Sequence, residues 1–164
     1  MYIVSRRRGI NQARGRDALA TAVEAGARAG EMLGMPVFVW SSLFSIEGAA
    51  VAWSARVEHL ADAVAIDDTL FADDDFAGWV EENDGLFVGS NADSIWQVVH
   101  GAPTGPPKQY LQATRAVCGN GTVSDAMALG VELAEAAAGI TGVPVMFVTG
   151  VTGAYGAVGW LSGV

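Results

Sequence analysis

The sequence predicts an α+β fold built from two copies of one β-α-β-β unit, and three observations support this. The stretch GMPVFVWSSL from Gly34 returns later in the chain as GVPVMFVTGV from Gly142. Both stretches place apolar side chains on both faces of a strand, which indicates strands that are covered on both sides. A long Ala-rich helical pattern precedes each stretch. Such a repeat indicates an internal duplication.

Sliding the chain so that Gly34 falls on Gly142 aligns nearly fifty positions without a gap. The matched positions include turn, charged and apolar residues: Tyr2 with Tyr110, Arg7 with Arg115, Asp17 with Asp125, Glu24 with Glu132, Gly34 with Gly142, Pro36 with Pro144, Ser41 with Thr149, and Gly48 with Gly156. Because turn residues keep the same register as apolar ones, duplication explains the match better than shared composition does.

Each copy is predicted to begin with a strand, residues 2–8 and 110–118, that leads through a loop into a helix. In the first copy the apolar residues have the spacing of one buried helix face: Leu19, Ala22, Val23 and Gly26. Gly34 and Gly142 are predicted to end the two helices, because glycine readily takes the left-handed conformation found there. The strands of the opening motif follow, and a glycine turn leads to third strands at 49–55 and 157–163.

The first copy continues where the second does not. After its third strand come one or two amphipathic helices with an acidic outer face, and then the strand DSIWQVVHG. The order is therefore β-α-β-β-α-β, which is the ferredoxin-like order. The predicted organisation is a first unit at 1–101, a Pro/Gly linker at 102–109, and a second unit at 110–164 that lacks its last helix and strand.

A complete second copy would end near residue 208, which leaves two interpretations. Either the sequence is a fragment of a longer protein, or another subunit supplies the absent part. The third strand of the second unit would lack its covering helix, and an exposed strand edge pairs readily with another chain. The sequence therefore predicts self-association through that third strand.

The composition excludes several classes of partner. The net charge is −9, with 18 acidic residues against nine Lys and Arg, which disfavours nucleic acid. The run Arg6–Arg8 is interpreted as a strand end and not as a phosphate-binding patch. No apolar run reaches the roughly 18 residues of a membrane span, and the one cysteine, Cys118, excludes an internal disulfide framework. A cytoplasmic protein is predicted.

Motifs for metal or nucleotide binding are weak. The chain has only His59 and His100 as histidines, and no cluster of His, Cys and carboxylates with ligand spacing, so no metal site is predicted. The loop GNGTVS at Gly119 precedes a helix but lacks the third glycine and the distant acidic residue of a dinucleotide site. We interpret it as a turn followed by a helix cap.

Residues 45–100 resemble the dimeric α+β barrel superfamily, which includes antibiotic-monooxygenase-like, EthD-like and NIPSNAP-like domains. The resemblance rests on a glycine turn, a strand carrying Trp53, the helix entry SARVEHLADAV, the segment DDDFAGWVEE and a closing strand with Trp96. It implies tandem ferredoxin-like halves whose sheets close into one barrel around a small, largely apolar pocket. No cofactor is predicted from the residues, but some relatives bind haem, so the resemblance leaves haem open.

Six residues are candidates for lining that pocket: Arg7, Trp40, Trp53, Trp96, His100 and Arg115. The paired arginines would hold an acidic ligand or brace the barrel mouth with Asp and Glu. His100 is the candidate catalytic residue, because it follows Trp96 by four residues and is expected on the same strand face; a surface histidine is the alternative.

Two functions follow from these expectations. The first is a non-catalytic structural, self-assembling or small-ligand-binding module, for which a small apolar ligand is suitable. The alternative is a cofactor-independent monooxygenase that acts on a small aromatic or polyketide-like substrate. The sequence leaves open whether the protein is an enzyme.

Overall fold

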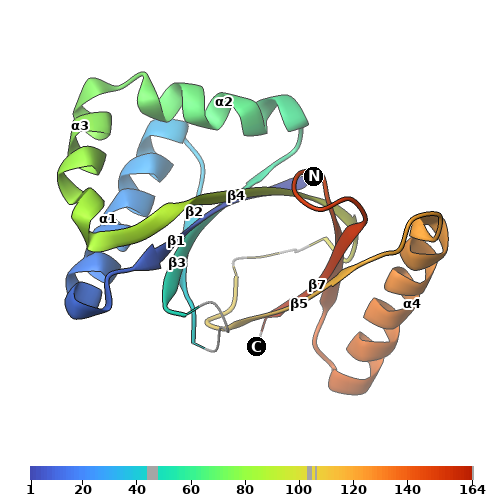
Figure 1. Ribbon diagram of the computed structural model, residues 1–164. Helices are drawn as coiled ribbons and strands as arrows, with labels where there is room; N and C mark the ends of the chain where they lie inside the picture. The colour runs from blue at the N-terminus through green and yellow to red at the C-terminus, as the bar shows by residue number, and fades with distance from the viewer. Residues whose placement is uncertain (44–47, 103–104, 106, 164) are drawn as a thin grey trace. The chain divides into compact units, whose positions relative to one another are not determined.

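The structure is a computed structural model that describes residues 1–43, 48–102, 105 and 107–163. It has the α+β architecture expected from the sequence (Figure 1). In chain order the elements are β1 (Tyr2–Ile10), the 3-10 helix η1 (Gln12–Arg14), α1 (Gly15–Leu33), β2 (Val37–Ser41), β3 (Ala50–Val57), α2 (Leu60–Phe71), α3 (Asp74–Asn83), the 3-10 helix η2 (Asp84–Leu86), β4 (Phe87–His100), β5 (Leu111–Val117), α4 (Val123–Thr141), β6 (Val145–Gly150) and β7 (Ala157–Gly163). None of the described helices is long and apolar enough to cross a membrane.

The chain divides into two compact units, and each is described by itself. The first unit is Tyr2–Asp93, and the second is Met1 with Ser94–Val164. The strand order is β2-β3-β1-β4 in the first unit and β4-β6-β7-β5 in the second, so β4 runs through both.

The predicted boundaries, at 1–101 and 110–164, remain a prediction. Residues 103, 104 and 106 of the predicted linker 102–109 lie outside the described residues.

The first unit confirms the ferredoxin-like order. β3 pairs antiparallel with both β1 and β2, and α1, α2 and α3 cover one face of these strands (Figure 1). The second helical stretch is divided in two, because Asp73 caps α3 by accepting a hydrogen bond from the Phe76 amide at 2.7 Å. β4 begins at Phe87, well before the predicted start at Asp93.

The second unit repeats the first three strands and the first helix. α1 and α4 both have 19 residues, and both of their ends match in the alignment that places Gly34 on Gly142. Gly34 and Gly142 end these helices with φ of 63° and 69°, a left-handed conformation that a side chain disfavours. The internal duplication is therefore visible in the backbone.

The repeat is gapless only as far as the turn before the third strand. Arg7 pairs with Ala52, and the equivalent Arg115 pairs with Gly159. Equivalent residues of the third strands are therefore one residue closer in sequence than those of the first strands. From Ala50 and Ala157 onward the predicted alignment is therefore wrong by one residue. As a consequence, the structural equivalent of Trp53 is Trp160.

These two tryptophans attach the sheet to the helix in the same way in each unit. The Trp53 indole N–H donates to the Ala22 carbonyl at 2.8 Å, and the Trp160 indole N–H donates to the Gly130 carbonyl at 2.9 Å. Ala22 and Gly130 occupy the same position in α1 and α4 and are therefore equivalent. Each bond satisfies a half-buried indole that would otherwise lack a partner.

The helix and the sheet also approach closely, and the two units make room for this differently. In the first unit Gly26 faces Val39, and a methyl group on Gly26 would overlap that side chain. In the second unit the larger Phe147 occupies the position of Val39, and the glycine is Gly130 beneath its ring. Phe147 is fully buried in the second core with Ala134 and Val158.

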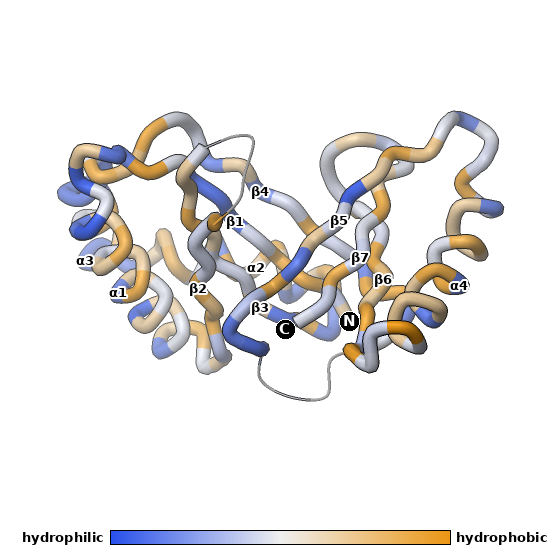
Figure 2. Tube along the Cα trace, turned by 90° about the horizontal axis from the view of Figure 1, so that it is seen from below, coloured by the Kyte–Doolittle hydropathy of each residue, from blue (hydrophilic) through white to orange (hydrophobic). Residues whose placement is uncertain are grey.

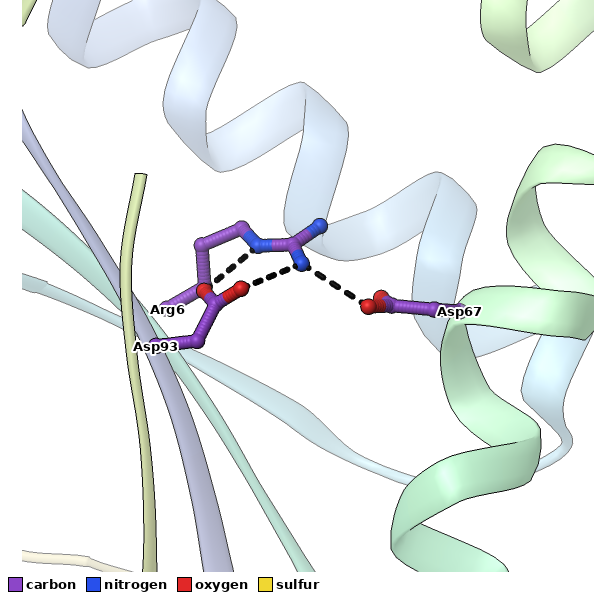
Figure 3. Close-up of polar contacts among 3 residues, drawn as sticks. All are labelled: Arg6, Asp67 and Asp93. Carbon is purple, nitrogen blue, oxygen red and sulfur yellow. Dashed lines mark hydrogen bonds and ion pairs between the residues drawn. The ribbon is translucent and has the colours of Figure 1, made fainter. Parts of the chain in front are cut away.

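In the first unit the side chains of Arg6 and Arg8 lie on the helix-covered face of the sheet and bind aspartates there. Arg6 donates from Nε and Nη2 to both carboxylate oxygens of Asp93 on β4, each at 2.8 Å, and from Nη2 to Asp67 on α2 at 2.9 Å (Figure 3). Arg8 pairs with Asp84 at 2.8 Å. The hydrogen bond from Arg6 to Asp93 raises the pKa of Arg6 above its ordinary value. Arg6 and Arg8 thus form intramolecular ion pairs.

We expect Gly130→Ala to lower the free energy of unfolding by about 1–3 kcal/mol, because its methyl group must displace the Phe147 ring. The matched control is Gly139→Ala in the same helix, where the methyl group meets nothing within 4 Å. That control should stabilise the chain by up to about 1 kcal/mol through helix propensity. Urea unfolding followed by circular dichroism measures both, and equal effects would contradict the close packing.

We expect Arg6→Lys to destabilise the chain by about 1 kcal/mol, because lysine cannot bind Asp93 through two parallel hydrogen bonds. Arg14→Lys, in the exposed pair with Asp17, is the control and should cost less than about 0.5 kcal/mol. The raised pKa of Arg6 means that its contribution is complete below the ordinary arginine pKa and is lost only as the pH rises through the higher folded value. Denaturant unfolding at pH 6 and pH 9 should therefore give the same difference.

Candidate functional site

In the first unit, two of the predicted pocket residues lie on the sheet face opposite the helices. Trp53 contacts α1, so its neighbour Ala52 points to the other face. Arg7 on β1 and Trp40 on β2 both lie opposite Ala52 and share that face. Trp40 is held there by a hydrogen bond from its indole N–H to the Ser54 hydroxyl at 2.9 Å.

Trp53 itself lies on the helix face, where its indole stacks edge-on against Phe87 with ring centroids 5.8 Å apart. Its N–H is already bonded to α1. The structure therefore places this candidate in the helix-side core and separates it from Arg7 and Trp40.

Trp96 and Arg115 come together on the open sheet face of the second unit, opposite α4. The Arg115 guanidinium carbon lies 5.3 Å from the centroid of the Trp96 ring. Two glycines, Gly150 opposite Trp96 and Gly159 opposite Arg115, leave the space in which the side chains meet. A methyl group on Gly159 would stand 3.9 Å from the Trp96 ring. The Trp96 indole N–H donates to the Ser94 hydroxyl at 3.0 Å, which fixes the ring plane.

His100 does not share the face of Trp96, and the sequence expectation is wrong on this point. Trp96, Gln97 and Val98 pair in regular register with β6, but the register shifts between Val98 and His100. The extra residue, Val99, makes a β-bulge, and a bulge reverses the alternation of side chains after it. His100 therefore lies opposite Phe147, on the face that packs against α4.

On that face His100 lines an open depression of about 340 Å³ between the end of β4 and the C-terminal end of α4. The other lining residues are small or apolar: Gly101, Ala138, Gly142, Val143, Pro144 and Val145. Haem requires an axial ligand inside an enclosed apolar pocket. His100 could supply the ligand, but the depression is open and does not fit haem.

The described residues contain no group of three or more His, Cys, Asp or Glu side chains that could hold a metal ion. Cys118 is half-buried beside the turn at Gly156. The second unit carries few charged residues: three acidic and two basic in residues 94–164. Among the described residues, the face opposite α4 offers the Arg115 guanidinium, the Trp96 ring and apolar side chains, and Lys108 lies beside Gly163 at one end of it.

Sequence reasoning missed a second pair of the same kind. In the first unit the Arg56 guanidinium carbon lies 5.4 Å from the Phe38 ring centroid, on the same face as Trp40. The signal was present, because Phe38 precedes Trp40 by two residues on a strand. Arg56 was not predictable, since its face depends on the register of β3.

The third strand of the second unit, expected to be an exposed edge, is paired on both sides. β7 lies between β6 and β5, and Ala157 and Val158 are buried. Among the described strands of this unit the open edge belongs to β5, whose seven residues are all exposed. The route of self-association expected from the sequence is thus corrected, and self-association itself remains a prediction.

No protein-family model matches the chain, and no curated protein matches it. Several solved structures are similar in fold. A candidate monooxygenase from Fusobacterium nucleatum subsp. nucleatum has a TM-score of 0.68 and 5% identity over 98% of this chain and 74% of that one. A NIPSNAP-like domain protein from Burkholderia xenovorans has a TM-score of 0.51 and 17% identity over 65% of this chain and 91% of that one. A candidate chlorite dismutase has a TM-score of 0.50 and 10% identity over 100% and 80%.

The chain shares the tandem ferredoxin-like α+β fold with these structures. The resemblance stated from residues 45–100 is therefore confirmed at the level of fold, including the tandem ferredoxin-like arrangement. Identities of 5–17% support the fold alone. The similar structures include both monooxygenase candidates and NIPSNAP-like domains, so they do not choose between catalysis and binding.

The bulge makes a direct prediction for the Trp96 indole. Arg115→Gln should shift the indole N–H resonance of Trp96 in a nitrogen-15 correlation spectrum, because the guanidinium over the ring is lost. His100→Ala should leave that resonance in place, because His100 lies on the other face. A shift with His100→Ala as large as that with Arg115→Gln would contradict the bulge.

Proposed function

We propose that the protein is a non-catalytic small-ligand-binding module and that its second unit binds a small aromatic carboxylate. The observation that carries the proposal is the exposed Arg115, whose guanidinium lies over the Trp96 ring on the sheet face opposite α4. A guanidinium stacked on an aromatic ring keeps its outer N–H groups available for a carboxylate.

The surface around the pair suits the ring of such a ligand. Met146 and Leu161 lie opposite each other on this face, and both are apolar and half-buried. Gly159 lies next to the indole, since a methyl group there would stand 3.9 Å from the Trp96 ring. A carboxylate on Arg115 with its ring over these side chains would satisfy charge and apolar surface together.

The rival proposal is a cofactor-independent monooxygenase. It needs a base within hydrogen-bond reach of a substrate that stacks on Trp96. His100 was the candidate base, but the bulge at Val99 directs it to the α4 side of the sheet. The geometry of the described residues therefore supports binding better than proton abstraction at Trp96.

A binding experiment with matched ligands tests the proposal. A set of aromatic carboxylates and their carboxamides is titrated into the labelled full chain, and the Trp96 indole resonance is followed. Carboxylates should bind more tightly than the matching carboxamides. Arg115→Gln should weaken carboxylate binding by about 10- to 100-fold, since a hydrogen bond to a charged group contributes about 1.5–3 kcal/mol, and should leave the carboxamides unchanged.

Two controls complete the experiment. Arg14→Gln removes an exposed arginine of the first unit and should change nothing. His100→Ala should also leave the affinity unchanged. An equal loss of affinity for carboxylates and carboxamides with Arg115→Gln would refute the proposal. Oxygen-dependent turnover of a bound ligand that disappears with His100→Ala would also refute it.

A further inference from the structure

The turn between β5 and α4 has an asparagine followed by a glycine at its tip, and the proposed ligand site does not use this pair. Asn120 and Gly121 are both exposed, and the sequence has no other Asn–Gly pair. In Figure 2 the loop between β5 and α4 is pale and blue, between orange segments of the two elements. Gly121 has a φ of 85°, and a methyl group on it would meet nothing within 4 Å. The peptide bond between the two residues is therefore open to solvent on an unobstructed turn.

The turn is held by the residues on either side of its tip. The Thr122 amide donates to the Gly119 carbonyl at 3.2 Å, and the Thr122 hydroxyl donates to the same oxygen at 2.8 Å. Among the described residues, no hydrogen bond involves the Asn120 side chain or the Gly121 amide. The Asn120 carboxamide can therefore rotate toward the nitrogen of the next residue without breaking a hydrogen bond.

The three other asparagines of the chain lack this combination. Asn11 accepts a hydrogen bond from the Ala13 amide at 3.2 Å, and Asn83 donates one to the Trp79 carbonyl at 2.9 Å. Asn91 lies within β4, where the backbone is extended. Each is followed by a residue with a side chain, whose Cβ hinders a close approach to the backbone nitrogen. Both the following residue and the local structure therefore single out one asparagine.

We propose that Asn120 is a site of spontaneous deamidation through a cyclic imide formed with Gly121. The Gly121 amide nitrogen attacks Cγ of Asn120, and a new C–N bond forms as the bond to the carboxamide nitrogen breaks. The Gly121 nitrogen loses its proton, the departing nitrogen gains one, and ammonia leaves. Water then adds to one of the two imide carbonyls and opens the ring to aspartate or isoaspartate. The reaction consumes only water.

The two products act differently on α4, whose first residue is Val123. Aspartate leaves the backbone unchanged and adds a negative charge before the helix N-terminus, where the helix dipole favours it. Isoaspartate places an extra carbon in the main chain between Gly119 and Thr122. That insertion separates the two donors of Thr122 from the Gly119 carbonyl, so the turn before α4 opens and the start of the helix frays. This modification is independent of the proposed ligand site.

Incubation of the full chain at pH 6 and pH 9, followed by proteolysis and mass spectrometry, tests the proposal. Asn120 should convert to the acid at least about tenfold faster than the three other asparagines, because the residue after it has no Cβ. The rate should rise with pH, since the Gly121 amide must lose its proton for its nitrogen to attack. Asn120→Gln should stop the conversion on the same time scale, because its longer side chain has to close a larger ring.

Ala92→Gly is the matched control, because it creates a second Asn–Gly pair within β4. Asn91 in that variant should stay intact, since the strand holds its backbone extended. Hydrogen exchange of residues 123–130 should be faster in the isolated isoaspartate product, whereas Asn120→Asp should match the native chain.

Equal rates at all four asparagines, or a rate independent of pH, would overturn the proposal. Conversion of Asn91 in the Ala92→Gly chain as fast as that of Asn120 would also overturn it, because the turn would then make no difference. Unchanged hydrogen exchange in the isoaspartate product would overturn the predicted effect on α4.

Discussion

The separation of helix and sheet in each repeat is the constraint on which the other features depend. An indole N–H must reach a helix carbonyl within hydrogen-bond distance, and it does so at 2.8 Å from Trp53 and 2.9 Å from Trp160. A glycine in each helix makes room for this close approach: a side chain on Gly26 would overlap Val39, and one on Gly130 would overlap the Phe147 ring. Each such bond contributes only about 0.5–1.5 kcal/mol, but it decides which face of the third strand points to the helix.

That choice of face fixes the remaining side chains by strand alternation. Once Trp53 points to α1, Arg7 and Trp40 must point away from it, and the same reasoning places Arg115 on the open face of the second unit. The exception is β4, where Val99 interrupts the alternation. One inserted residue therefore places His100 and Trp96 on opposite faces of the sheet.

Local signals in the sequence were sufficient for the repeat and for its helices. Gly34 and Gly142 mark the helix ends because few other residues take a positive φ there. The one-residue shift before β7 was not predictable, because loops tolerate changes of length without altering the strands that they join. The bulge at Val99 also leaves no mark in a run of apolar residues, and the edge position of β5 depends on pairing between strands distant in sequence.

The two units share the order of their first strands and helix, but the side chains on the helix side of their sheets differ. In the first unit Arg6 and Arg8 bind carboxylates that are more than half exposed, and such pairs contribute little stability. Burial of Leu70 and Phe76 against α1 must supply most of the attraction, because it removes apolar area from water. The arginines add orientation, because Arg6 binds both carboxylate oxygens of Asp93. The second unit keeps the apolar attraction in Leu133 and Ile140 and has lost the arginines. Thr114 and Ala116, at the positions of Arg6 and Arg8, cannot form the ion pairs that orient the covering segment of the first unit.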